Sequence, residues 1–527
     1  MLDRTKERFR LRIIIPAFPA FNIYSYIADR TTALGPVCVA TAANKLQHWD
    51  VEVIDENNLR MHGPRGPIGA DHKLLQWIRP ADVVGFYGGL TSTIPRLYEL
   101  SNFYKKAGCI TLAGGQHFLE ENIEEGLNSN LDYIIRGEAE ETIEEFLLAL
   151  ENNKSLEGIK GLAYRQNGKT VLTPERPEIT DFDQFPIPDF SLVRYARIIM
   201  YPVGRIRGCG MNCEFCTVKG NIRCASPERL MEQISLLLET KDARHFFVVD
   251  DLFGQQRSET LRFCELLKNY QLAIKKRLDL AVQIRLDKAK DAELLTAMRA
   301  AGINIVCIGY ESPVEEELEV MNKHLKSQDM VDLTKLYHKA GFIIHGMFIF
   351  GYPAKEGTSF TLSIDERVKA YRNFIKKAGV DTIQVLLPVP LPGTEFRKRL
   401  QSQNRIYPKE RLGWEYYDGN FPLFEPDPPI TAEQMQEAVK KIMGKFYRFR
   451  HMFMILVNII LFPSMIFYLH NIKPGWRQWY RQWRNHLIRF GGWMTFRGWM
   501  AAFKKDPFSE NLQKAKEDLT AQKGLKK

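Results

Sequence analysis

Short apolar runs alternate with amphipathic helical stretches along the first 400 residues of the chain. The first five runs are LRIIIPAF, DVEVID, DVVGFYG, CITLAGG and LDYIIRG, between residues 11 and 137. Runs this apolar are typical of strands covered on both faces of a parallel sheet. Because helical stretches separate them, the pattern predicts a doubly wound, Rossmann-like α/β domain over residues 1–154. Ligands of such sheets bind beyond the carboxyl ends of the strands.

Residues 155–195 interrupt this alternation. LAYRQNGKTVLT indicates a hairpin with Asn167 and Gly168 in the turn, and the proline-punctuated segment DFDQFPIPDF that follows favours extended backbone. We predict that this stretch is a linker that contains a hairpin.

Six further apolar runs follow over residues 196–400. They are YPVGRIRG, HFFVVDD, LDLAVQIRL, INIVCIGYES, FIIHGMFIFGYP and TIQVLLPVP, with helical stretches such as SPERLMEQISLLLET between them. Six consecutive βα units predict a closed or partial barrel of the TIM type. Chemistry in such barrels takes place at the carboxyl ends of the strands.

Three of the eight cysteines lie in RIRGCGMNCEFCTVKG, just past the first strand of this barrel. Their spacing is C-x3-C-x2-C, at Cys209, Cys213 and Cys216. Thiolates are soft ligands that favour iron–sulfur clusters, zinc and cuprous ions. A zinc site completed by Cys224 or a histidine is the alternative, but zinc sites usually carry paired C-x2-C spacing and the sequence has no second pair. The spacing therefore favours an iron–sulfur cluster.

This cysteine spacing, with Phe215 before the third cysteine and a six-strand βα barrel around it, resembles the radical S-adenosylmethionine (SAM) superfamily. The resemblance implies a four-iron four-sulfur (4Fe-4S) cluster on the three cysteines, with one iron open to SAM. For Asp250 and Asp251, which follow a strand, the alternative role is a helix N-cap. For Arg285 and Glu311, the alternative is a surface ion pair. The SAM contacts that the resemblance implies are Phe215, Asp250, Asp251, Gln283, Arg285 and Glu311.

The first domain resembles the cobalamin-binding domain that precedes the barrel in one class of this superfamily. The segments that carry the resemblance are TALGPVCVATAANKL, DVVGFYGGLTST, LAGGQHFLEE and LDYIIRGEAEETIEEF. The loop after the first strand, PAFPAFNIYSYIADR, lacks the D-x-H-x-x-G motif, so no histidine ligand to cobalt is expected. A degenerate domain kept as a scaffold is the alternative. The cobalamin contacts implied are Thr91, Ser92, Gly114, Gly115, Gly137 and Glu138.

The region 401–527 is predicted to be mostly helical and ends in an apolar, then a tryptophan- and arginine-rich segment. Residues 452–469 carry no charge, which reaches only the lower limit of length for a membrane span, and Asn458 and Pro463 weaken that interpretation. Tryptophan and arginine at helical spacing in PGWRQWYRQWRNHLIRF suit an anionic membrane surface. A helical lid on the barrel is the alternative.

Composition adds two points. The formal charge is +10, from 73 Lys and Arg against 63 Asp and Glu. A basic balance can indicate nucleic acid, but here the basic residues accompany an apolar run and no recognition motif is present, so nucleic acid is not expected. The N-terminus lacks the apolar core of a secretory signal, so we expect a cytoplasmic chain, held at the inner face of the membrane by its C-terminal segment.

These features predict a radical SAM enzyme that uses a 4Fe-4S cluster, SAM and cobalamin. The resemblance implies methylation, or formation of a carbon bond, at an unactivated carbon, and the apolar tail suggests a hydrophobic or lipid substrate. An electron donor such as a flavodoxin or ferredoxin is implied as a partner. The rival functions are a radical cyclase of the anaerobic magnesium-protoporphyrin ester cyclase type and a non-catalytic sensor of cobalamin or the cluster. The sequence assigns no catalytic residue.

Overall fold

The first five apolar runs form the parallel strands of one sheet, in the order β5-β4-β3-β1-β2. The computed structural model describes residues 2, 5–59, 63–323, 325–355, 357–358, 362–469 and 473–525, and side chains of these except at 120, 461–478 and 525. The strands are β1 (Phe9–Ile15), β2 (Trp49–Asp55), β3 (Val83–Tyr87), β4 (Ile110–Gly114) and β5 (Tyr133–Ile135).

Helices cover both faces of this sheet, as the sequence predicts. Leu11 and Ile13 of β1 pack in the same core cluster as α2 (Leu34–Ala43) and α6 (Glu140–Asn152), whereas Ile14 packs with residues of α3 (His72–Ile78), α4 (Ile94–Lys106) and α5 (Glu120–Asn128). Alternate side chains of a strand point to opposite faces, so β1 is buried on both. A short helix, α1 (Ser25–Ala28), lies in the loop after β1.

Both ends of the segment 155–195 are attached to the first sheet. The predicted hairpin forms as β6 (Leu162–Gln166) and β7 (Lys169–Leu172), and β6 pairs antiparallel with β5. At the opposite edge, β8 (Val193–Arg194) pairs parallel with β2. The segment between β7 and β8 thus connects the two edges of the sheet, while the domain boundaries at 154, 195 and 400 remain our proposal.

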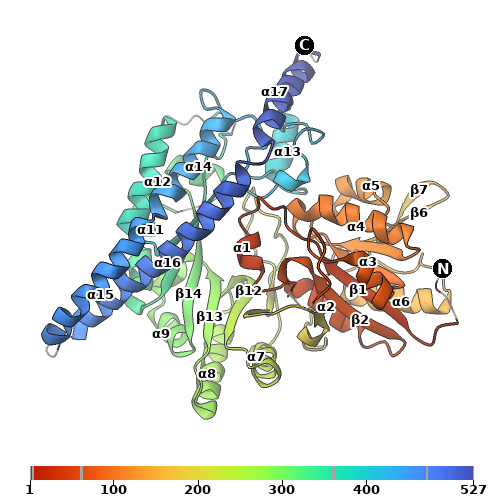
Figure 1. The fold of residues 1–527 in the computed structure, drawn as a ribbon, viewed down its shortest axis with the longest axis horizontal. Helices are drawn as coiled ribbons and strands as arrows, with labels where there is room; N and C mark the ends of the chain where they lie inside the picture. The colour runs from red at the N-terminus through yellow and green to blue at the C-terminus, as the bar shows by residue number, and fades with distance from the viewer. Residues whose placement is uncertain are drawn as a thin grey trace.

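The second series forms a six-stranded parallel sheet in the order β16-β15-β14-β13-β12-β9. Its outer strands β9 and β16 do not pair with each other among the described residues, so the sheet is a partial barrel (Figure 1). The strands are β9 (Met200–Val203), β12 (His245–Phe253), β13 (Asp279–Ile284), β14 (Ile303–Glu311), β15 (Ile343–Ile349) and β16 (Thr382–Leu386), and the helices between them are α7 (Pro227–Lys241), α8 (Arg257–Ile274), α9 (Ala292–Ala300), α10 (Glu315–Val320), α11 (Ser327–Ala340) and α12 (Ile364–Ala378).

The rest of the chain is helical, with α13 (Glu395–Ser402), α14 (Ala432–Phe446), α15 (Arg450–Leu469), α16 (Lys473–Phe503) and α17 (Phe508–Leu525). Helices α15 and α16 pack against each other, and α16 also contacts α14 and β16. The last part of α16 is a packed element, because Trp499 is buried and Phe503 stacks on Phe421 with 5.2 Å between ring centroids. None of the helices in the described residues is long and apolar enough to cross a membrane.

A fully buried ion pair joins the first two strands. Arg12 of β1 and Glu52 of β2 both have side chains that are 0% exposed, and Arg12 Nε donates to Glu52 Oε1 at 2.7 Å. Glu52 also pairs with Arg79 (2.8 Å), which follows α3, and with Arg194 of β8 (3.0 Å). The carboxylate of Glu52 therefore ties β1, β8 and the residue after α3 to β2.

We expect Glu52→Gln to destabilise the protein strongly, because it leaves the buried Arg12 charge without a counter-ion. Removing one partner of a buried ion pair costs about 3–5 kcal/mol in free energy of unfolding. Lys6→Gln is the matched control, since Lys6 pairs with Asp82 at the surface and such a pair contributes about 0–1 kcal/mol. Urea denaturation checks both, and similar values for the two variants would contradict this role of Glu52.

Candidate active site

The three predicted ligand cysteines lie in one loop at the carboxyl end of the barrel. This cysteine loop, residues 208–222, connects β10 (Ile206–Arg207) to β11 (Arg223–Cys224). All three are free thiols of intermediate exposure, and the backbone N–H of Cys216 donates to the carbonyl of Cys213 at 3.2 Å. Burial raises the pKa of the Cys216 thiol, and the nearby Cys209 and Cys213 raise it further.

As a donor set, three soft thiols in one partly exposed loop fit an iron–sulfur cluster. In the described part of the chain, no three His, Cys, Asp or Glu side chains lie together in a way that could hold a metal ion. The three cysteines of the loop do not form such a group either. The assignment of the cluster to Cys209, Cys213 and Cys216 therefore stays a prediction, supported by the chemistry of the loop.

Asp250 and Asp251, at the end of β12, hold the backbone that leads into the cysteine loop. Asp250 Oδ1 accepts hydrogen bonds from the backbone N–H groups of Arg205 (2.7 Å) and Ile206 (2.9 Å), and Asp251 Oδ2 accepts one from Gly208 (2.7 Å). Burial raises the pKa of Asp250 to about 6, against the effect of those two N–H groups. Neither aspartate caps a helix, and Asp250 Oδ2 is buried without a hydrogen-bond partner in the described structure.

Two further predicted SAM contacts approach the same loop from β13 and β14. Arg285 pairs with Asp287 at 2.9 Å, and its guanidinium also lies 3.2 Å from the sulfur of Met211, between the first two cysteines. Glu311 has a positive φ of 60° and pairs with Lys323 at 2.9 Å. Burial raises the pKa of the Cys213 thiol, and the nearby Lys323 ammonium partly offsets that rise.

The remaining two predicted SAM contacts differ in their surroundings. Phe215 is half-buried and packs edge-on against Tyr352, with 6.1 Å between ring centroids. Gln283 is exposed on β13, and no hydrogen bond of its side chain is present among the described residues. Phe215 thus lies in the cysteine loop itself, Arg285 and Glu311 approach that loop through Met211 and Lys323, and Gln283 makes none of these contacts.

Glu214, between the second and third cysteines, is a site residue that sequence reasoning missed. Its carboxylate accepts hydrogen bonds from the Tyr352 hydroxyl (2.8 Å) and from Arg399 Nε (2.7 Å) and Nη2 (3.1 Å). Its own carbonyl accepts the N–H of Phe396 at 3.1 Å. Glu214 therefore anchors the middle of the cysteine loop to α13 and to the loop after β15, and a charged residue inside the motif was the available signal.

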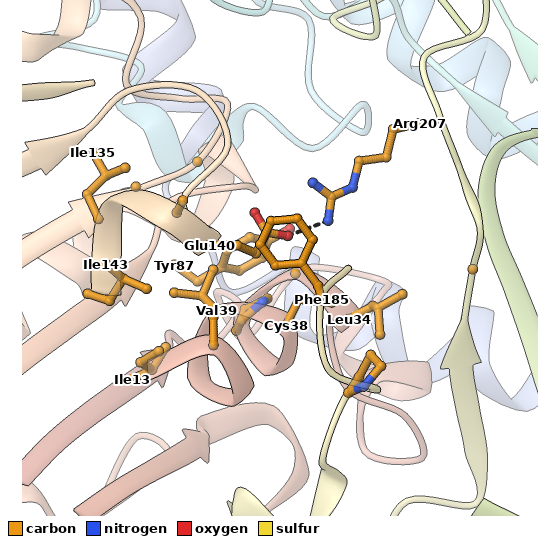
Figure 2. Close-up of a pocket in the computed structure, with 18 of the residues that line it drawn as sticks. Ile13, Leu34, Cys38, Val39, Tyr87, Ile135, Glu140, Ile143, Phe185 and Arg207 are labelled. Atoms are coloured by element: carbon orange, nitrogen blue, oxygen red, sulfur yellow. Dashed lines mark hydrogen bonds and ion pairs between the residues drawn. The ribbon is translucent and has the colours of Figure 1, made fainter. Parts of the chain in front are cut away.

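A cavity of about 360 Å³ opens where the carboxyl ends of the two sheets meet. On one side it is lined by β1, β3, β4 and β5 with α2 and α6 above them, and on the other by residues 204–207, Val249 and Asp251 of the barrel. Figure 2 shows Ile13, Cys38, Val39, Ile135 and Ile143 around its apolar end. Asp251 thus contributes to the wall of this cavity and also holds the cysteine loop.

Three of the residues predicted to contact cobalamin line this cavity, namely Gly114, Gly115 and Gly137. Gly115 has a φ of 124°, and a Cβ atom there would lie 2.5 Å from the carbonyl carbon of Gly88, so no other residue fits. The close approach of backbone to the cavity at this point depends on glycine.

The other three predicted cobalamin contacts, Thr91, Ser92 and Glu138, do not line the cavity. Thr91 and Ser92 are buried in the short 3-10 helix Thr91–Thr93, where Ser92 Oγ accepts from Asn22 at 3.4 Å, and neither lines the cavity. Glu138 pairs with Arg207 of β10 and Arg223 of β11, both at 2.8 Å. Burial acts to raise the pKa of Glu138, but the hydrogen bonds from Arg223 and Arg207 lower it below its usual value.

Arg207 joins the two sheets directly before the cysteine loop. Besides Glu138, its guanidinium binds Glu140 at the start of α6, as the dashed line in Figure 2 shows, and it lies 4.7 Å from the centroid of the Phe182 ring. Sequence reasoning missed both Arg207 and Glu140. The signal was an arginine at the end of an otherwise apolar strand.

We expect Asp250→Ala to loosen the cysteine loop, because it removes two charged-acceptor hydrogen bonds, each contributing about 1.5–3 kcal/mol. The iron content after anaerobic reconstitution should fall, and maleimide should label the thiols of the metal-free protein faster. Asp250→Asn keeps an oxygen acceptor and serves as the control, with both readouts near those of the wild type. Equal labelling rates in the two variants would contradict the positioning role.

Comparisons with known proteins agree with this arrangement. The family model of the radical SAM superfamily matches residues 203–357, from the end of β9 to just beyond β15. The chain is 28% identical over 326 residues to an uncharacterized methyltransferase of Pyrococcus horikoshii, covering 60% of this chain and 67% of that protein. It is 24% identical over 382 residues to the anaerobic magnesium-protoporphyrin IX monomethyl ester cyclase of Rubrivivax gelatinosus, covering 68% of this chain and 65% of the cyclase.

Among solved structures, the radical SAM methyltransferase TsrM from Kitasatospora setae, with cobalamin and a 4Fe-4S cluster bound, matches with a TM-score of 0.61. The match has 16% identity and covers 75% of this chain and 78% of TsrM. The matched length exceeds that of the partial barrel alone. Residues 203–357 therefore form a radical SAM domain, and the chain as a whole has a fold like that of TsrM.

Proposed function

We propose that this enzyme binds a 4Fe-4S cluster, SAM and cobalamin, and methylates an unactivated carbon of a hydrophobic substrate. The observation that carries the proposal is the cavity shared by both sheets, whose wall includes Asp251, the residue that holds Gly208 next to Cys209. A cofactor in this cavity would lie beside the cysteine loop. The methyltransferases among the relatives, and the cobalamin bound in TsrM, support this assignment.

The cluster with SAM would supply a 5′-deoxyadenosyl radical, and methylated cobalamin would supply the methyl group. Cys209, Cys213 and Cys216 would hold the cluster, because thiolates are the usual ligands of iron–sulfur clusters. Asp250 Oδ2 is a buried acceptor without a partner among the described residues, while Oδ1 holds the backbone, and it is suited to a SAM amino group. Lys323 and Glu311 add a charged pair beside Cys213 that can orient a zwitterionic ligand.

The cavity suits the tail of a cobalamin in two respects. Its walls are mostly apolar, and glycines at Gly114, Gly115 and Gly137 let the ligand approach the backbone. Among the described residues that line it there is no histidine. The side chains would therefore hold cobalamin by shape and exclude water from the space beside the cysteine loop.

We expect Val39→Trp to abolish the retention of cobalamin, because the larger side chain of α2 fills the apolar end of the cavity. Filling a binding cavity removes the contacts that bury the ligand. Val39→Ala, which leaves the cavity open, is the matched control. Cobalamin absorbance after anaerobic purification checks the prediction, with iron content unchanged in both variants, and retention of cobalamin by Val39→Trp would place the ligand elsewhere.

A radical cyclase is the second candidate, favoured by the likeness to the magnesium-protoporphyrin ester cyclase of Rubrivivax gelatinosus. A third candidate, a non-catalytic sensor, would make no product. The reduced, reconstituted enzyme should release 5′-deoxyadenosine from SAM and, with deuterium-labelled methyl donor, transfer the label to product. Product without label would favour the cyclase, and no 5′-deoxyadenosine would favour the sensor.

The choice of a hydrophobic or lipid substrate is supported by the apolar C-terminal segment. We propose in addition that the enzyme is cytoplasmic and attaches peripherally to an anionic membrane surface, and that a small electron-transfer protein of the flavodoxin or ferredoxin class reduces the cluster. The exposed phenylalanines Phe449 and Phe453, at the start of α15, support the membrane surface. Residues 461–478, which include half of the apolar run, lie outside the described side chains.

A further inference from the structure

A second hollow, of about 510 Å³, lies among the C-terminal helices and is lined by basic side chains. It is enclosed by α12, α14, α15 and α16, next to Gly379, which follows α12 and precedes β16. The basic side chains that line it are Arg372, Lys376, Lys445, Arg448, Arg450 and Arg489. No acidic residue is among the described residues that line it.

Most of these basic side chains have no partner among the residues that the structure describes. Arg489 donates to the carbonyls of Val380 (2.9 Å) and Asp381 (3.2 Å), and so has a structural role. In contrast, the side chains of the other five basic residues form no ion pair or hydrogen bond with any residue that the structure describes. Like charges gathered around one hollow repel each other, and an anion bound between them relieves that repulsion.

The sequence around the hollow has the same one-sided charge. Between Glu437 and Asp506 every charged residue is a lysine or arginine. This segment contains thirteen lysines and arginines, whereas the formal net charge of the whole chain is only +10. The remainder of the chain is therefore slightly acidic. The positive charge of this protein is therefore concentrated on α14, α15 and α16.

An apolar stripe lies next to the hollow on α15 and the residue before it. Phe449, Phe453, Leu456 and Ile460 are 50%, 63%, 51% and 74% exposed. Their spacing of four, three and four residues places them on one face of the helix. A contiguous row of large exposed apolar side chains is uncommon on a soluble protein and marks a contact with a partner or a membrane.

The hollow is remote from the candidate active site. It adjoins the residues that precede β16, at the amino end of the barrel strands, whereas the cysteine loop and the cavity lie at their carboxyl end. Figure 1 shows α15 and the adjoining part of α16 extending past the barrel, away from the first sheet. A ligand in the hollow would therefore be an anchor and not the substrate.

We infer that this hollow binds the phosphate groups of anionic phospholipids while the apolar stripe of α15 enters the outer part of the acyl layer. Arginine and lysine beside large apolar residues on a helix are the combination that binds an anionic bilayer surface. A nucleic acid would use the charges but leave Phe453, Leu456 and Ile460 in water. The inference deepens the proposed membrane association and does not depend on the proposed chemistry.

The test is sedimentation of the full-length enzyme with vesicles of phosphatidylcholine alone and of phosphatidylcholine mixed with phosphatidylglycerol. We expect binding only to the mixed vesicles, and weaker binding at high salt. Arg372→Gln with Lys376→Gln removes two charges from the rim of the hollow and should weaken binding by about 30-fold, at about 1 kcal/mol per basic residue. Phe453→Ser with Ile460→Ser should abolish the binding that persists at high salt.

The matched control is Lys106→Gln with Lys154→Gln, which removes two exposed lysines from the first domain and should leave vesicle binding unchanged. Equal binding by the two charge variants would overturn the inference. The inference would also be overturned if the wild type bound duplex DNA more tightly than the mixed vesicles, and if Arg372→Gln with Lys376→Gln weakened that DNA binding to the same extent. Release of 5′-deoxyadenosine is measured in parallel, and should be normal in the hollow variants. Its loss in every protein, with vesicle binding intact, would count against the proposed chemistry alone.

Discussion

The position of the cysteine loop depends on carboxylates that bind it from two directions. From the barrel, Asp250 and Asp251 bind the backbone N–H groups of Arg205, Ile206 and Gly208. From the first sheet, Glu138 and Glu140 bind the guanidinium of Arg207 in the same short segment. A loop of three thiols has no regular structure of its own, so these contacts decide where the thiols lie. They also bring the carboxyl ends of two separate parallel sheets together.

That constraint explains why the cavity forms where it does. Parallel sheets leave their ligand sites at the carboxyl ends of the strands, where the loops can vary without disturbing the core. Here the two edges face each other across Arg207, so residues of both sheets line one space. A radical formed at the cysteine loop would be generated beside the cavity. Within the first sheet, the buried pair of Arg12 and Glu52 joins β1 to β2.

The sequence predicted the strands and the glycines better than it predicted the carboxylates. Every predicted strand formed, because apolar runs between helices record burial directly. Gly115 was predictable because only glycine adopts its backbone conformation next to Gly88. Glu138 was expected at cobalamin and instead binds Arg207 and Arg223, about 70 and 85 residues away along the chain. Which charged groups meet depends on how the two sheets dock, and a local pattern does not contain that information.

The C-terminal helices show the same limit. The sequence left a membrane surface and a lid as alternatives, and the structure has features of both, since Trp499 is buried in the core while Phe453 is exposed.

The central claim is that the cluster and cobalamin occupy adjacent but separate sites. Iron and cobalamin content after anaerobic purification of the wild type and of the variant with Cys209, Cys213 and Cys216 changed to alanine tests it most directly. We predict both in the wild type, and cobalamin without iron in the variant. Iron retained by the variant, or iron without cobalamin in the wild type, would contradict the account.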